Sequence, residues 1–250
     1  MKRSQFAVLL FCAATLFFLT SCGGNDSADK KNTDTTATGD NTAKTTEPAP
    51  EKSTIVTTPE NMMIVTHKVS NFAKFQAAYD GHDSMRLASG IHNYVIARGV
   101  QDSNMVMVVV KADDVAKAKA FAKAPSLKTA MQKAGVTGAP TISFNVSTWP
   151  DTAMLAPGII RSRTTFTVKD WDAWVKAFQE GKQERMDNGI VDRVIGHDAD
   201  DNKKVSLVTA VVDTAKAFAY YKSDALKKRR ADGGVIGEPV RFLFKVVKRY

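Results

Sequence analysis

Residues 69–90 read VSNFAKFQAAYDGHDSMRLASG, and residues 168–189 read VKDWDAWVKAFQEGKQERMDNG. The correspondence continues without a gap over 69–146 and 168–245, at a constant offset of 99 positions. Roughly a quarter of the aligned residues are identical, and most of the others keep their polarity. The chain is therefore a duplicated small domain, and the duplication restricts its fold more than any single motif does.

An aromatic stripe at steps of three and four residues predicts the first helix of each repeat. In the first copy the stripe comprises Phe72, Phe75, Tyr79, His82 and Arg86. In the second copy it comprises Trp171, Trp174, Phe178, Gly181 and Arg185. Asn71 and Asp170 are suited to cap these helices, and Gly90 and Gly189 are suited to end them, because glycine accepts the left-handed conformation.

Segments rich in β-branched residues predict strands at 63–69, 91–98, 105–111 and 141–146. A second helix, rich in Ala and Lys, begins after Asp114 and is interrupted at Pro125. The second copy repeats the same order, with strands at 190–197, 205–211 and 240–247. The order β-α-β-β-α-β is that of the ferredoxin-like fold. We therefore expect an α+β protein of two tandem ferredoxin-like repeats, at 59–149 and 150–250.

The chain resembles the dimeric α/β-barrel superfamily, whose small members include antibiotic-biosynthesis-monooxygenase-like domains. The resemblance covers residues 62–250. It rests on the aromatic stripe with Arg86, on Ala116-Lys117-Ala118, on Pro125-Ser126-Leu127 and on Gly135-Val136-Thr137-Gly138-Ala139-Pro140. It implies that the two repeats pair sheet against sheet as a pseudo-dimeric α/β barrel within one chain, so that no second chain is required.

The first residues have the pattern of a bacterial lipoprotein signal peptide, predicted here at 1–21. Lys2 and Arg3 precede an apolar stretch at 6–19 that is too short to span a bilayer as a stable helix. Leu19-Thr20-Ser21-Cys22 resembles a lipobox, which implies cleavage before Cys22 and a lipid anchor on this residue. Gly23 stands where an inner-membrane retention aspartate would stand. We therefore expect anchoring in the outer membrane facing the periplasm, with display on the cell surface as the alternative.

Residues 22–58 are rich in Thr, Ala, Asp, Lys and Pro, which predicts a lipidated, disordered tether. The formal net charge of the chain is +9, and without Lys2 and Arg3 it is about +7. Neither repeat combines aromatic residues with a basic groove, so we expect no nucleic-acid partner. The second cysteine, Cys12, belongs to the predicted signal peptide, which leaves the mature chain without a disulfide or a cysteine-based metal site. No metal or cofactor is indicated.

His82, Asp83 and Arg86 form the densest set of reactive side chains, and His67 on the preceding strand is a fourth candidate. A histidine beside a carboxylate can act as an acid or base near neutral pH. An arginine there could bind an anionic or carbonyl group. The structural alternative is that Arg86 ends the packed stripe, as its counterpart Arg185 indicates. The second copy has no counterpart of either histidine, so the sequence confines any site to the first repeat.

The leading interpretation is a membrane-anchored envelope lipoprotein that is non-catalytic or binds a small aromatic or anionic ligand. One alternative is a cofactor-independent monooxygenase-like or isomerase-like enzyme with its pocket in the first repeat. The other is an envelope interaction module that uses the basic second repeat.

Overall fold

The computed structural model describes residues 53–250, which contain both repeats. The predicted signal peptide, Cys22 and most of the predicted tether lie outside the described residues. The first repeat consists of β1 (Glu60–Val69), α1 (Phe72–Gly81), α2 (Asp83–Leu87), β2 (Ile91–Gly99), β3 (Met105–Ala112), α3 (Val115–Lys123), α4 (Pro125–Lys133) and β4 (Val136–Pro150).

The second repeat has the same order of elements. It consists of β5 (Ile160–Val168), α5 (Trp171–Glu180), α6 (Lys182–Asp187), β6 (Ile190–Asp198), β7 (Lys204–Val211), α7 (Thr214–Tyr221), α8 (Asp224–Asp232) and β8 (Val235–Arg249).

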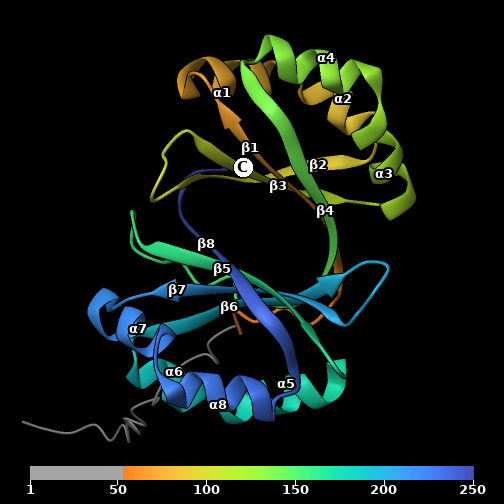
Figure 1. The fold of residues 1–250 in the computed structure, drawn as a ribbon. Coiled ribbons are helices and arrows are strands. Elements are labelled where there is room, and N and C mark those ends of the chain that lie inside the picture. The colour runs from red at the N-terminus through yellow and green to blue at the C-terminus, as the bar shows by residue number, and fades with distance from the viewer. Residues whose placement is uncertain (1–52) are drawn as a thin grey trace, which may run out of the picture. The chain divides into compact units, whose positions relative to one another are not determined.

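The eight strands form one closed barrel in the order β1-β3-β2-β8-β5-β7-β6-β4, and every neighbouring pair is antiparallel. Within each repeat the order is that of the ferredoxin-like sheet, with the first and third strands in the middle. Helices α1–α4 cover one side of the barrel and α5–α8 cover the opposite side (Figure 1). The predicted fold class, two tandem ferredoxin-like repeats that form a pseudo-dimeric α/β barrel, is confirmed.

The closing strands β4 and β8 join the two repeats, and both are longer than the sequence predicts. The first part of β4 pairs with β1 of its own repeat, and residues 145–150 pair with β6 of the other repeat. In the same way, residues 235–245 of β8 pair with β5, and residues 244–249 pair with β2. The added length arises from pairing between the repeats. A Cβ atom at Gly196 of β6 would collide with the carbonyl of Val146, so the join between β4 and β6 requires a very small residue.

The helix ends follow the predicted signals. The side chains of Asn71 and Asp170 accept hydrogen bonds from the backbone N–H groups of Lys74 and Ala173, as N-caps do. The prediction of a single helix through the shared arginine was wrong in both copies: α1 ends at Gly81 and α2 begins at Asp83, and α5 ends at Glu180 and α6 begins at Lys182. The helix is interrupted at residue 82, where the backbone leaves the helical conformation (φ −106°, ψ 23°).

The apolar core consists of layers on both sides of the barrel wall. Between the helices and the sheet, Phe75 and Ile91 anchor the first repeat, and Trp174 and Val168 anchor the second. A separate cluster lies inside the barrel and draws on both repeats, with Ile64, Val95, Ala97, Met107 and Phe244 as its buried members. Inward-facing positions alternate with helix-facing positions along each strand.

The end of the predicted tether is ordered. The backbone N–H of Thr152 donates a hydrogen bond to the Thr54 carbonyl, and that of Val56 donates one to the Pro150 carbonyl. Between them, Ile55 forms an isolated β-bridge with Asp151. The predicted disorder up to residue 58 was therefore wrong for residues 54–56, which pair with residues 150–152 at the start of the connection between the repeats. Among residues 53–250, no helix has the length and apolar character to cross a membrane.

Candidate functional site

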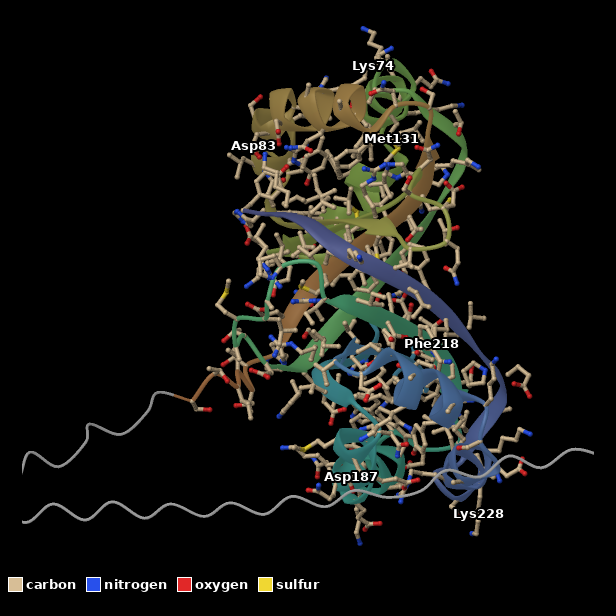
Figure 2. The ribbon with its side chains drawn as sticks, turned by 90° about the vertical axis from the view of Figure 1, so that its left-hand side faces the viewer. Lys74, Asp83, Met131, Asp187, Phe218 and Lys228 are labelled. Atoms are coloured by element: carbon tan, nitrogen blue, oxygen red, sulfur yellow. The ribbon has the colours of Figure 1, made fainter. Side chains whose placement is uncertain are left out.

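Arg86, one of the four predicted site residues, is buried between α2 and β2. Its guanidinium carbon lies 3.8 Å from the centroid of the Tyr79 ring, and its Nη2 lies 3.3 Å from Oδ1 of Asp83. Asp83 also accepts a hydrogen bond of 2.6 Å from Asn93, and the Tyr79 hydroxyl donates one of 2.6 Å to Asn93. Asp83 lies at the side of the helix layer (Figure 2). These four side chains fasten α2 to β2.

The second repeat contains the same arrangement in a stronger form. The guanidinium of Arg185 lies 3.5 Å from the centroid of the Phe178 ring and donates two hydrogen bonds to Asp192, at 2.8 and 2.7 Å. Both side chains of this pair are almost fully buried, at 7% and 8% exposure. Asp192 stands at the position that Asn93 occupies in the first repeat. The shared arginine therefore packs on an aromatic ring and pairs with a carboxylate in both copies, although the carboxylate comes from the helix in the first copy and from the strand in the second.

His67, His82 and Arg86 line one pocket between the helices and the sheet of the first repeat, whereas Asp83 is outside the pocket lining. Neither ring nitrogen of His67 has a hydrogen-bond partner among the described residues. Burial lowers the pKa of His67 from its usual 6.5 to about 4, so its ring is neutral at physiological pH. His82 donates a 2.6 Å hydrogen bond from Nδ1 to the Ala78 carbonyl.

This pocket is small and almost entirely apolar. Its volume is about 60 Å³, whereas an apolar cavity known to hold benzene measures about 150 Å³. The corresponding pocket of the second repeat measures about 90 Å³, and Phe166 stands there in place of His67. The pocket that His67, His82 and Arg86 share therefore has little room for a substrate.

A larger cavity, of about 230 Å³, lies inside the barrel, between the two sheets. Strands of both repeats line it, and it extends to the end of the barrel at the exposed residues Thr152 and Arg249. Three buried polar atoms without a hydrogen-bond partner in the described part of the chain belong to its lining: Asn145 Oδ1, Ser147 Oγ and Arg193 Nε. The other buried polar atoms without a partner in the described residues belong to the linings of the two smaller pockets: they lie on His67 and Arg86 in the first repeat, and on Tyr220, Tyr221 and Arg241 in the second.

The cavity is also cationic. Arg161 and Arg163 of β5 line it, and neither forms an ion pair with a carboxylate of residues 53–250. Arg163 donates hydrogen bonds to the hydroxyls of Ser206 and Ser143, at 3.1 and 3.3 Å. Burial lowers the pKa of Arg163 to about 10, and burial with the nearby Arg249 lowers that of Arg161 to about 10. Both side chains therefore stay charged at neutral pH.

The two carboxylates at this cavity have cationic partners. Asp151 pairs with Arg193 at 2.8 Å, and Glu60 pairs with Lys111 at 2.5 Å. In the part of the chain that the structure describes, no group of three or more His, Cys, Asp or Glu side chains is placed to hold a metal ion. The arrangement provides hydrogen-bond donors and positive charge, which are groups suited to binding.

No protein-family model matches the chain, and no curated protein matches it in sequence. Solved structures match it in fold. An anthrone oxidase-like protein superposes with a TM-score of 0.54 at 15% identity, over 78% of this chain and 95% of that protein. This is the dimeric α/β-barrel fold.

Two further structures share the arrangement at lower similarity. A monooxygenase from Fusobacterium nucleatum subsp. nucleatum has a TM-score of 0.49 at 11% identity, covering 76% of this chain and 93% of its own. A heme-binding protein from Thermus thermophilus has a TM-score of 0.43 at 11% identity, covering 80% of this chain and 95% of its own. At 15% identity, the match to the anthrone oxidase-like protein shows the α/β-barrel fold and says nothing about the chemistry of this protein.

The residues of the barrel cavity are not among those that the sequence predicts as a site. A usable signal was present in the alignment of the repeats, because Arg161 and Arg163 align with the apolar residues Met62 and Ile64. In a strand, two positions two residues apart face the same side. Two charged residues on the same face of a strand, at positions where the other repeat has apolar residues, indicate that this face does more than pack in the core.

Proposed function

We propose that this protein is a membrane-anchored binding protein that holds a small ligand in the cavity inside its α/β barrel. The observation that carries the proposal is a cavity of about 230 Å³ whose lining includes three buried polar atoms without a partner among residues 53–250, on Asn145, Ser147 and Arg193. Leaving such a group unsatisfied costs about 1–3 kcal/mol, so native proteins retain few of them without a reason. A ligand with polar atoms would satisfy these groups.

Size supports a ligand in the barrel. The cavity of about 230 Å³ exceeds the roughly 150 Å³ that accommodates a benzene ring, and it reaches exposed residues at one end of the barrel. Chemistry supports binding without catalysis. Glu60 and Asp151 are the carboxylates of the lining, and each is engaged by a cation, so neither is poised as a general base.

Replacing Asn145 by Phe tests this function. The second repeat has Phe244 at the equivalent position, so the new ring suits the barrel interior and occupies the cavity. We expect some small aromatic compounds, screened as neutral and anionic pairs, to raise the Tm of the parent protein by about 5–10 °C at a hundredfold excess over Kd. The Asn145→Phe variant should be more stable without ligand, by about 0.5–2 kcal/mol, and should lose these shifts. Shifts that persist in the variant would place the ligand elsewhere.

The membrane anchor is part of the proposal and is supported by the lipobox-like Leu19-Thr20-Ser21-Cys22. Several acyl chains on Cys22 would give stable attachment, because each buried methylene contributes about 0.8 kcal/mol. The protein would then act at the periplasmic face of the outer membrane. We expect cells fed a fatty-acid analogue to label the parent protein and to leave Cys22→Ser unlabelled. A label that persists in Cys22→Ser would contradict the anchor.

A second candidate function is an oxidation in the pocket of the first repeat, of the kind that the name of the anthrone oxidase-like protein suggests. The unpartnered ring of His67 favours it. Two properties make it the weaker candidate: the volume of about 60 Å³, and the His67 pKa of about 4, which describes a weak base. Ligand-induced shifts that disappear in His67→Phe and persist in Asn145→Phe would favour this second function.

A further inference from the structure

The wall of the barrel cavity is divided into a polar half and an apolar half. Four consecutive strands of the barrel, β5, β7, β6 and β4, form the polar half. This half contributes Arg161, Arg163, Ser206, Arg193, Asn145 and Ser147, interspersed with valines. The other four consecutive strands, β1, β3, β2 and β8, form the apolar half, in which Met62, Ile64, Met107 and Phe244 face the cavity and the strand-end residues Glu60 and Arg249 are the charged members. A molecule inside the barrel would meet a different surface on each side.

The division into a polar and an apolar half does not coincide with the division into repeats, because each half contains strands of both repeats. On β5, Arg161 and Arg163 replace the Met62 and Ile64 of β1. In the opposite sense, Asn145 and Ser147 of β4 stand where β8 has Phe244 and Val246. The other repeat has an apolar residue at each of these equivalent positions, so apolar residues would be sufficient to fill the interior of the barrel. The polar half is therefore a departure from the simplest packing.

Charge defines what the polar half accepts. Three arginines and Asp151, which follows β4, belong to the polar half and give it an excess of two positive charges, whereas Arg249 and Glu60 of the other half balance each other. Arg193 is paired with Asp151, whereas Arg161 and Arg163 have no carboxylate partner among residues 53–250. Arg161 and Arg163 are half-buried, so their charges are partly removed from water, and an anion bound beside them would offset that cost. Guanidinium groups bind planar carboxylates with two parallel hydrogen bonds, which suits them to this class of anion.

We propose that the barrel cavity binds an organic carboxylate with a compact apolar body, whose carboxylate meets Arg161 and Arg163 and whose apolar body packs on β1, β3, β2 and β8. This inference rests on the proposed function, because it names the ligand class of the same cavity. An inorganic anion would leave the apolar half unused, and a neutral ring would leave the two arginines unpaired.

The test compares benzoate, phenylacetate and hexanoate with their neutral amides, and with inorganic phosphate, at constant ionic strength. The protein is the full chain, and the readout is the ligand-induced rise in Tm, supported by calorimetric titration. The variant is Arg161→Met with Arg163→Ile, which installs the residues of the equivalent positions in the first repeat. The control Lys227→Met with Lys228→Met removes two exposed positive charges on α8 instead. A second control, His67→Phe, alters the pocket outside the barrel.

We expect at least one carboxylate to raise the Tm of the parent and of both controls by about 5 °C or more at a hundredfold excess over Kd, and its amide to have at most a tenth of its affinity. The arginine double variant should fold with an unchanged or higher Tm and lose the carboxylate shift. Amides that bind as well as carboxylates, with binding lost in Asn145→Phe, would overturn the ligand class and leave the proposed function intact. The ligand class would also fail if phosphate matched the carboxylates, or if the double variant retained their shift. No shift in the parent with any compound would overturn both proposals.

Discussion

Replacing Asp192 by Ala is expected to lower the free energy of unfolding by about 3–5 kcal/mol. The carboxylate is almost fully buried and accepts two hydrogen bonds from Arg185, at 2.8 and 2.7 Å. Without Asp192, the guanidinium keeps one hydrogen bond among the described residues, to the Phe178 carbonyl at 2.7 Å, and its contact with the Phe178 ring. An uncompensated buried charge of this kind is among the most destabilising changes in a protein core. Urea denaturation of the parent and the variant measures the loss.

Two matched substitutions show whether burial of the pair is the cause. Asp83→Ala removes the partner of the equivalent Arg86, but this carboxylate is 46% exposed and its contact is 3.3 Å, so the loss should be about 1 kcal/mol. Asp224→Ala removes a fully surface-exposed partner of Lys227 and should change stability by less than about 0.5 kcal/mol. Equal losses for all three variants would contradict the assignment of Arg185 and Asp192 as the fastening of α6 to β6.

Acidification from pH 7 to pH 4 is expected to remove about 3 kcal/mol of stability through His67 alone. Its pKa is about 4 in the folded protein and 6.5 in the unfolded chain, because burial disfavours the charged ring. The unfolded chain therefore binds the proton more readily. This contribution to stability is fully present above pH 6.5 and is lost as the pH falls toward 4, at about 1.4 kcal/mol per pH unit.

His67→Phe isolates this effect, because Phe166 at the equivalent position of the second repeat packs against Trp174 and shows that the site tolerates a ring without charge. The difference in unfolding free energy between parent and variant should change by about 3 kcal/mol between pH 7 and pH 4. The lowered pKa values of Asp80, Asp102 and Asp151 also reduce stability as the pH approaches 3.8, but these residues occur in both proteins, so their effect cancels in the difference. If the unfolding free energies of the parent and the variant change by the same amount between pH 7 and pH 4, His67 does not titrate as described.

Much of the fold could be predicted from local sequence, because the deciding interactions join residues that are close in the chain. Asn71 and Asp170 cap helices through hydrogen bonds to residues three positions away, and Gly90 and Gly189 have φ angles of 67° and 68°, as the predicted stops require. The break at His82 escaped prediction, since the aromatic stripe keeps its spacing across it. The full lengths of β4 and β8 also escaped, because their last residues pair with strands of the other repeat.

The difference between residues that are close in the chain and residues that are brought together by the fold is larger for the candidate site. The sequence predicts a site around His82, Asp83 and Arg86, which lie close together along the chain. In the structure Asp83 and Arg86 belong to a fastening network, and His82 is turned toward the Ala78 carbonyl. The cavity of the barrel combines Asn145 of β4, Arg163 of β5 and Arg193 of β6, which are up to 48 positions apart and are brought together by barrel closure.

The sequence by itself determined that this protein is a duplicated ferredoxin-like chain, because periodicity, caps and turns act over a few residues and occur in both copies. Only the tertiary structure decided where a ligand could lie. Alternation along a strand shows which residues share a face, but it does not show what that face meets. Closure of the barrel turned one face of each sheet inward, and it placed the unpaired arginines of β5 opposite the apolar residues of β1 across a single cavity.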